Sequence, residues 1–311
     1  MLSVRNLINT PSLTRDDIRQ ILDTAATFEQ VNSRTIKKLP TLRGRTIVNL
    51  FLEPSTRTKS SFELACKRLG ADTLSVAGSS SSVVKGESLV DTVLTLDAMN
   101  VDMFICRAKY AGSPEIIART TGARVINAGD GKHAHPTQAL LDLYTMRKRF
   151  GRLEGLRVGI VGDSLHSRVV GSLVPALRTV GAEVTLIGPA TFLPAAPEAL
   201  GATSCARIDD VLGDLDVVYM LRVQNERLDG AAIPSVREYA ALYGLDARRA
   251  ARMRPEAVVM HPGPVNRGVE LTSEVADSPR ALILNQVNAG VSVRMAAIYL
   301  LLGGESDVVS D

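Results

Sequence analysis

The residues best suited to chemistry stand between positions 51 and 63, where an apolar run gives way to hydroxyls and an arginine. Residues 47–52 are nearly all apolar, as expected of a parallel strand that is covered on both faces. Apolar side chains then recur at helical spacing from Phe62 to Leu69 and stop at Gly70, where a left-handed cap is expected. The pattern predicts a buried strand, a polar turn and a helix.

The first turn of that helix is rich in groups that bind anions. Ser55 is the expected N-cap, and Thr56, Arg57 and Thr58 follow it. Backbone N–H groups, hydroxyls and a guanidinium would then meet at the positive end of the helix dipole, which suits an oxyanion. An ordinary cap beside a solvated arginine is the alternative. Four polar donors in succession after a buried strand favour a phosphate cradle.

Strand-like runs and helical stripes alternate along the chain, which predicts an α/β fold with parallel sheets. In the first half one strand–helix unit occurs four times, with strands expected at 46–52, 73–76, 103–106 and 124–127. Ser113 is expected to cap the third helix with Pro114 at its first position. Residues 128–131 are expected to form a loop, and His135 with Pro136 opens the fourth helix.

Polar residues follow the strands of this first half at their carboxyl ends, where open α/β sheets bind ligands. They are Ser55, Thr56, Arg57, Thr58, Lys85, Arg107, His135 and Gln138. Donors and cations dominate, and the set contains neither a nucleophile nor a metal cage, since the spacing of His133, His135 and the nearby carboxylates suits a metal poorly. We therefore expect no metal or cofactor. A site that binds a phosphate and polarises an adjacent oxygen is predicted.

The second half begins near Arg152, with strands expected at 156–161, 183–187, 217–221 and 257–260, and a helical tail over 287–302. A dinucleotide loop after the first of these strands is disfavoured, because its glycines lack the G-x-G-x-x-G spacing. Arg168, Arg222 and Gln224 also follow strands. Each arginine by itself is more often structural, but two at strand ends suit a small dicarboxylate.

Length and composition narrow the class of protein. A chain of 311 residues predicts two domains, and a net charge of +3 without a basic, aromatic stripe argues against nucleic acid as a partner. The three cysteines are far apart, which indicates reduced thiols. The first residues lack the apolar core of a signal peptide, and the longest late apolar run is too short to span a bilayer. We expect a cytoplasmic protein with no membrane association.

Five motifs together resemble the aspartate/ornithine carbamoyltransferases over nearly the whole chain. They are Ser55 to Thr58, Lys85 to Glu87, His135 to Gln138, Arg222 to Gln224 and His261 to Pro264. The first and third are shared by the whole superfamily. The fourth, extended to Arg227, resembles the aspartate branch, and His261-Pro-Gly-Pro264 stands where ornithine enzymes typically carry His-Cys-Leu-Pro.

The resemblance implies a role for each motif residue. Ser55, Thr56, Arg57, Thr58 and Arg107 would hold the phosphate of carbamoyl phosphate. His135, Arg107 and Thr58 would polarise its carbonyl, while Gln138 and the main chain at 262–264, including Gly263 and Pro264, would engage its NH2 group. Arg168, Arg222 and Gln224 would bind aspartate. Ser81 and Lys85 would enter the site from a neighbouring subunit of a homotrimer, with Lys85 also contacting aspartate.

The family fold has two doubly wound domains, each a mainly parallel sheet flanked by helices, with the C-terminal helix returning to the first domain. By this resemblance, residues 1–150 with 287–311 bind carbamoyl phosphate and residues 151–286 bind aspartate. Two departures stand out: Ala108 and Lys109 follow Arg107 where histidine with proline or serine is common, and Gly263 replaces a leucine of some members. The resemblance also implies a cis bond before Pro264.

Three questions stay open at this point. An ornithine or other carbamoyltransferase is the nearest rival, although Arg168 and Arg222 would repel a cationic side chain. A catalytically silent scaffold for a pathway partner is the rival of another class, but no motif position is lost. A regulatory or dihydroorotase chain as a partner of an active enzyme is compatible with the sequence.

Overall fold

The computed structural model describes residues 2–78, 87–223 and 235–303, which fold into two compact units. Unit 1 comprises Met1–Tyr144, Gly171–Leu173 and Asn288–Asp311, and unit 2 comprises Thr145–Val170 and Val174–Val287. No helix among the described residues combines the length and apolar character needed to cross a membrane.

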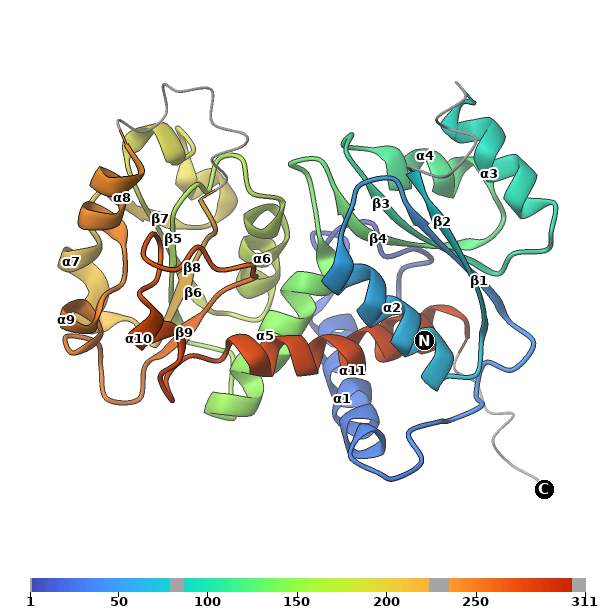
Figure 1. Ribbon diagram of the computed structural model, residues 1–311, viewed down its shortest axis with the longest axis horizontal. Coiled ribbons are helices and arrows are strands. Elements are labelled where there is room, and N and C mark those ends of the chain that lie inside the picture. Colours follow the sequence, from blue (N-terminus) through green and yellow to red (C-terminus); the bar gives the residue numbers. More distant parts are fainter. Residues whose placement is uncertain (1, 79–86, 224–234, 304–311) are drawn as a thin grey trace. The chain divides into compact units, whose positions relative to one another are not determined.

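Unit 1 is built on a four-stranded parallel sheet in the order β2-β1-β3-β4 (Figure 1). Its strands are β1 (Thr46–Phe51), β2 (Asp72–Ala77), β3 (Met103–Ala108) and β4 (Arg124–Asp130). Its helices are α1 (Arg15–Asn32), α2 (Thr56–Arg68), α3 (Leu89–Asp97), α4 (Ser113–Thr120), most of α5 (Pro136–Phe150) and most of α11 (Ile283–Leu301). The four strand–helix units expected from the sequence are confirmed.

Successive side chains of a strand point to opposite faces of the sheet, and the inner strands of unit 1 bury both faces. Val48 and Leu50 of β1 pack in one apolar cluster with Val93 of α3 and Ile117 of α4. Helix α2 covers the opposite face (Figure 1), and its Phe62 is fully buried. Burial on both sides explains why β1 and β3 read as continuous apolar runs, whereas the edge strand β2 has no fully buried residue.

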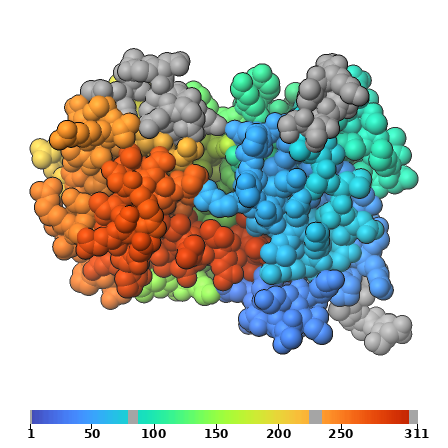
Figure 2. All heavy atoms as spheres, viewed as in Figure 1, coloured from blue at the N-terminus to red at the C-terminus, as the bar shows by residue number. Residues whose placement is uncertain are grey.

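The C-terminal helix α11 belongs to unit 1 for most of its length, as the family fold implies. It packs on α1, where the rings of Phe28 and Tyr299 meet edge to face at 5.7 Å. It also lies beside α2 (Figure 1), through a hydrogen bond of 2.8 Å from Arg294 to Ser61. In the space-filling view, atoms of α2 cover part of α11 (Figure 2).

Unit 2 has a five-stranded parallel sheet in the order β7-β6-β5-β8-β9. The strands are β5 (Arg157–Val161), β6 (Glu183–Ile187), β7 (Thr203–Cys205), β8 (Val217–Met220) and β9 (Val258–Met260), and the helices are α6 (Arg168–Thr179), α7 (Ile208–Val211), α8 (Val236–Tyr243), α9 (Ala247–Ala250) and α10 (Ser273–Ala276). Short 3₁₀ turns occupy Ala190–Phe192, Pro197–Leu200 and Leu212–Asp214. Side chains from α7, α8 and α10 pack on the inner strands.

Two local predictions are wrong. The N-cap of α4 is Gly112, in the left-handed region at φ 84°, so Ser113 is the first helical residue rather than the cap. Residues 128–130 belong to β4 rather than to a loop. The buried carboxylate of Asp130 explains the second error, since it accepts hydrogen bonds from Gly112 N, Asn127 Nδ2 and Ala134 N and so orders a glycine-rich segment.

Candidate active site

The first turn of α2 presents the anion-binding groups expected from the sequence. Ser55 is the N-cap with an extended backbone, but its hydroxyl makes no capping hydrogen bond, so it does not occupy the first-turn N–H groups. Thr58 is buried, whereas Thr56 and Arg57 are exposed. A 13-residue helix therefore begins with a set of donors at the positive end of its dipole.

Arg107 stands beside this turn because β1 and β3 are paired neighbours in the sheet. Phe51, the last residue of β1, is in register with Arg107 near the end of β3. The Arg107 Nε lies 3.3 Å from Glu53 Oε2, and its Nη1 donates to the carbonyl of Ala128 at 3.3 Å. From β1 the chain runs to β2 on one side and later to β3 on the other, so these residues occupy the switch point where open α/β sheets bind ligands.

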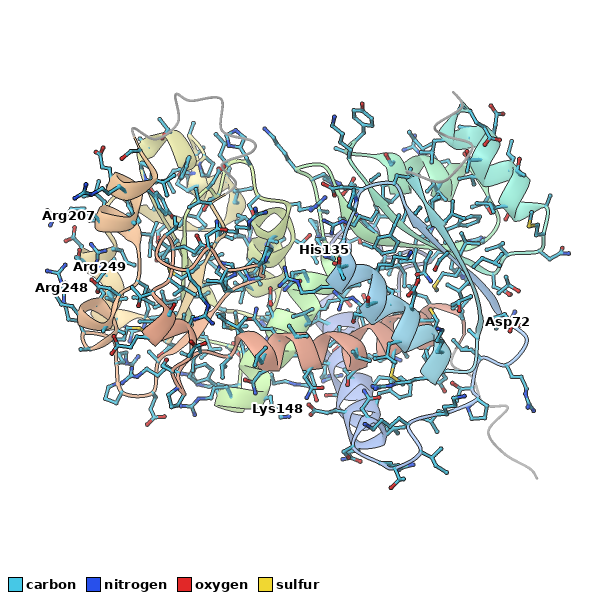
Figure 3. The ribbon with its side chains drawn as sticks, in the orientation of Figure 1. Asp72, His135, Lys148, Arg207, Arg248 and Arg249 are labelled. Carbon is cyan, nitrogen blue, oxygen red and sulfur yellow. The ribbon has the colours of Figure 1, made fainter. Side chains whose placement is uncertain are left out.

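His135 directly precedes α5 (Figure 3). A hydrogen bond of its backbone fixes its place. Its N–H donates to Ser172 Oγ at 2.8 Å, and the carbonyl of Ser172 accepts from Thr10 Oγ1 at 2.7 Å. Gly171 permits this approach, since a Cβ there would lie 2.3 Å from the carbonyl oxygen of His133. The His135 side chain is 5% exposed. An imidazole on a backbone fixed in this way can serve as a positioned hydrogen-bond donor.

In unit 2 the two arginines lie around a second switch point, between β5 and β8. Arg168 is the first residue of α6, which is capped by Ser167 through a bond from Val170 N at 3.4 Å. Arg222 lies two residues after β8, and the intervening Leu221 N donates to Val161 O at 2.8 Å. Two cations beyond the carboxyl ends of neighbouring strands suit a dianion. Gln224, Ser81 and Lys85 lie outside the described residues.

The loop after β9 has the unusual backbone that its sequence suggests. The bond between Gly263 and Pro264 is cis, as expected, and Gly263 has φ 63°. A left-handed φ favours glycine and gives a local reason for the absence of leucine here. The His261 Nδ1 accepts from Gly263 N at 2.7 Å, so its Nε2 carries the proton and donates to buried Glu270 at 3.1 Å.

Family models match both halves of the chain. The carbamoyl-P binding domain of aspartate/ornithine carbamoyltransferase matches residues 5–148, and the Asp/Orn binding domain matches residues 154–301. The chain belongs to the aspartate/ornithine carbamoyltransferase family. The family resemblance and the fold expected from the sequence are thus confirmed.

Individual members of this carbamoyltransferase family are similar over nearly their whole length. The aspartate carbamoyltransferase catalytic subunit of Salinispora tropica is 56% identical over 97% of this chain and 99% of its own. Aspartate transcarbamoylase from Trypanosoma cruzi, solved with carbamoyl phosphate and aspartate, has a TM-score of 0.87 and 30% identity over 94% of this chain and 96% of its own. Ornithine carbamoyltransferase from Pyrococcus furiosus has a TM-score of 0.86 and 27% identity over 97% and 98%.

Sequence reasoning missed the residues that hold the expected site residues in place. Glu53 lies two residues before the first motif, but the sequence gives no sign that its partner is Arg107. Ser172 and Asp142 carry no comparable signal, since each is one polar residue on a helix whose partner depends on the fold. Glu270 follows the last motif closely, but only the turn of the loop brings it to His261.

Proposed function

We propose that this carbamoyltransferase transfers the carbamoyl group of carbamoyl phosphate to the amino group of L-aspartate, giving N-carbamoyl-L-aspartate and phosphate. The observation that carries the choice of aspartate is the pair of arginines at the second switch point, Arg168 at the start of α6 and Arg222 after β8. Two guanidinium groups match two carboxylates and oppose a cationic side chain.

In this proposal each of the two domains binds one substrate. Residues 1–150 with 287–311 bind carbamoyl phosphate, and residues 151–286 bind aspartate. The matched family domains support this division. The first turn of α2, from Ser55 to Thr58, holds the phosphate together with Arg107. His135, Arg107 and Thr58 polarise the carbonyl, and Gln138 with the backbone at Gly263 and Pro264 binds the NH2 group. Arg168, Arg222 and Gln224 bind aspartate.

The proposed reaction needs no covalent intermediate with the protein. The neutral amino group of aspartate forms a bond to the carbonyl carbon, and the carbonyl electrons move onto its oxygen. Donors aimed at that oxyanion stabilise the tetrahedral intermediate. The bond from carbon to the phosphate oxygen then breaks, and the leaving phosphate takes the proton of the amine. Phosphate binding at the dipole of α2 stabilises the leaving group.

The same proposal extends to assembly and location. Ser81 and Lys85 complete the site of a neighbouring chain in a homotrimer, with Lys85 also acting on aspartate. The protein works in the cytoplasm as a step of pyrimidine biosynthesis, where its three free cysteines stay reduced. Regulatory or dihydroorotase chains are compatible partners of such a trimer.

The purified protein should release phosphate from carbamoyl phosphate when L-aspartate is present, with carbamoyl aspartate formed in equal amount. L-Ornithine and other amines with cationic side chains serve as the comparison substrates at the same concentration. We expect a large preference for aspartate. Product formation from ornithine but not from aspartate would overturn the proposed substrate, and no product from any amine would overturn the activity.

A further inference from the structure

A buried acid holds the amide of Gln138 in one orientation. The Nε2 of Gln138 donates to Asp142 Oδ1 at 3.0 Å, one turn further along α5. Asp142 is fully buried and Gln138 is 9% exposed. An ionised carboxylate only accepts hydrogen bonds, so the amide that meets it must present its NH2 group. The Oε1 of Gln138 is therefore left as the acceptor available to another donor.

A buried arginine near the C-terminal end of the chain interacts electrostatically with Asp142. Arg294 of α11 is 4% exposed, its Nη1 donates to Ser61 Oγ at 2.8 Å, and its guanidinium lies over the Phe62 ring at 5.0 Å. Burial lowers the pKa of Arg294 to about 10, and the negative charge of Asp142 acts in the opposite direction. Arg294 therefore stays charged at neutral pH, with the Asp142 side chain among the charges that act on it.

Gly290 leaves the space that the Arg294 guanidinium occupies. A Cβ on Gly290, one turn before Arg294 in α11, would lie 2.5 Å from Arg294 Nη1. Glycine is less favourable than alanine inside a helix, and its lack of a Cβ leaves the space that the guanidinium occupies. Helix α11 thus contributes both the buried Arg294 and the glycine that leaves space for its guanidinium.

We infer that Asp142, paired electrostatically with Arg294, is a positioning residue that makes the enzyme select an NH2 group on its phosphate substrate. With the NH2 of Gln138 turned to Asp142, its Oε1 accepts from the carbamoyl NH2. A substrate with a methyl group at that place offers no donor and leaves the Oε1 unpaired. This inference rests on the proposed function, because it assigns Gln138 to the carbamoyl group.

Two stable analogues that differ only at this group provide the test. Phosphonoacetamide carries the NH2 and acetonylphosphonate carries a methyl in its place, and calorimetry measures the dissociation constant of each without turnover. We expect the parent to prefer the amide by about tenfold or more, because a site built to hydrogen-bond an NH rejects the analogue that lacks it. Asp142→Asn should remove most of that preference, since asparagine also donates and permits the reversed Gln138 amide.

A double-mutant cycle separates positioning from general damage. In a Gln138→Ala background, Asp142→Asn should change the preference no further, because the two residues act through one contact. Asp17→Asn is the matched control: Asp17 is also a buried acid of unit 1, but its partners are Ser3 and Thr14. The control should keep the parent preference even if it lowers stability.

Two further variants cover a failure of Asp142→Asn to fold. The double variant Asp142→Asn with Arg294→Gln removes both charges, and Gly290→Ala displaces the guanidinium while leaving every charge in place; both should lower the preference. Parent-like preference in each folded variant would overturn the inference while leaving the proposed function intact. Failure of the parent to bind either analogue, together with no carbamoyl aspartate formed, would overturn both.

Discussion

At the scale of single residues, the candidate site is a set of hydrogen-bond donors whose positions are fixed by neighbours from distant elements. His135 is held by Ser172 through its backbone, and Arg107 is held beside Glu53. Such fixed donors are effective because they need no reorganisation when charge develops on a substrate oxygen. The catalytic power proposed here therefore depends on residues that do not touch substrate.

Replacing His135 with alanine tests the proposed oxyanion donor. We expect kcat to fall by about 10² to 10³-fold, as for the loss of one oxyanion donor elsewhere, with a much smaller change in the affinity for carbamoyl phosphate. His133→Ala is the control, because His133 lies on the same loop but pairs with Asp130 at 3.0 Å and is 43% exposed. Steady-state kinetics on both variants give the answer, and a kcat close to the parent value for His135→Ala would contradict the role.

The three cysteines should differ sharply in reactivity. Burial raises the pKa of Cys66 to about 12 and raises that of Cys106 as well, whereas Cys205 is partly exposed on β7. At pH 8 only about one part in ten thousand of a thiol with such a pKa is thiolate. Iodoacetamide should label Cys205 in the native protein and all three cysteines in urea, as read by intact mass. Native labelling of Cys66 as fast as Cys205 would contradict this.

At the scale of elements, the sequence predicts strands well where both of their faces are covered. β1, β3 and β5 read as apolar runs because nearly all of their residues are buried inside a parallel sheet. The same reasoning missed β7, whose Thr203–Cys205 is a short edge strand of polar and half-exposed residues. Edge strands lack the burial that produces the signal.

The candidate site shows a similar division between what local sequence can and cannot reveal. Residues at or just beyond the carboxyl ends of buried strands, such as Arg107 and Arg57, could be grouped in advance because parallel strands end on the same side of a sheet. Asp142 and Arg294 could not, since they come from two helices 152 positions apart, the second of them in an apolar stripe that reads as core. Only the return of α11 to unit 1 brings the two together.

The start of α1 offers a prediction about pH. Thr14 and Asp17 form a capping box, and Ser3 also donates to Asp17 at 2.6 Å. Burial raises the pKa of Asp17, but the hydrogen bonds from Ser3 and Thr14 outweigh it and leave the pKa below its ordinary value of 3.8. The stabilisation is thus fully present above the unfolded pKa and is lost as the pH falls through the folded pKa.

Asp17→Asn should therefore lower the free energy of unfolding by about 1 kcal/mol near neutral pH, the usual worth of a helix cap. The difference between variant and parent should shrink as the pH falls below 3.8, where the unfolded parent begins to bind the proton, and should be lost below the folded pKa, where the carboxyl is protonated in both states. Urea titrations at several pH values measure both quantities. A difference that is constant down to the lowest pH at which the parent folds would show that the charge of Asp17 is not the cause.

At the scale of the whole molecule, the proposal places each active site between two chains, and this can be tested without locating the contact. Arg57 and Lys85 belong to one site but come from different subunits in the proposed homotrimer. Arg57→Ala and Lys85→Ala chains should each be nearly inactive alone, because every site then lacks one of the two cations. After the two kinds of variant chain are mixed, dissociated and reassembled, some sites should again contain both Arg57 and Lys85.

The recovered activity has an expected size. A site works only when one chain supplies Arg57 and its neighbour supplies Lys85, so random assembly at equal amounts should restore about one quarter of the parent activity in a closed ring with head-to-tail interfaces. Each variant reassembled with itself is the control and should stay inactive. A mixture that also stays inactive, although native mass measurement shows hybrid trimers, would mean that both cations belong to the same chain's site, and Lys85 would then act within its own subunit.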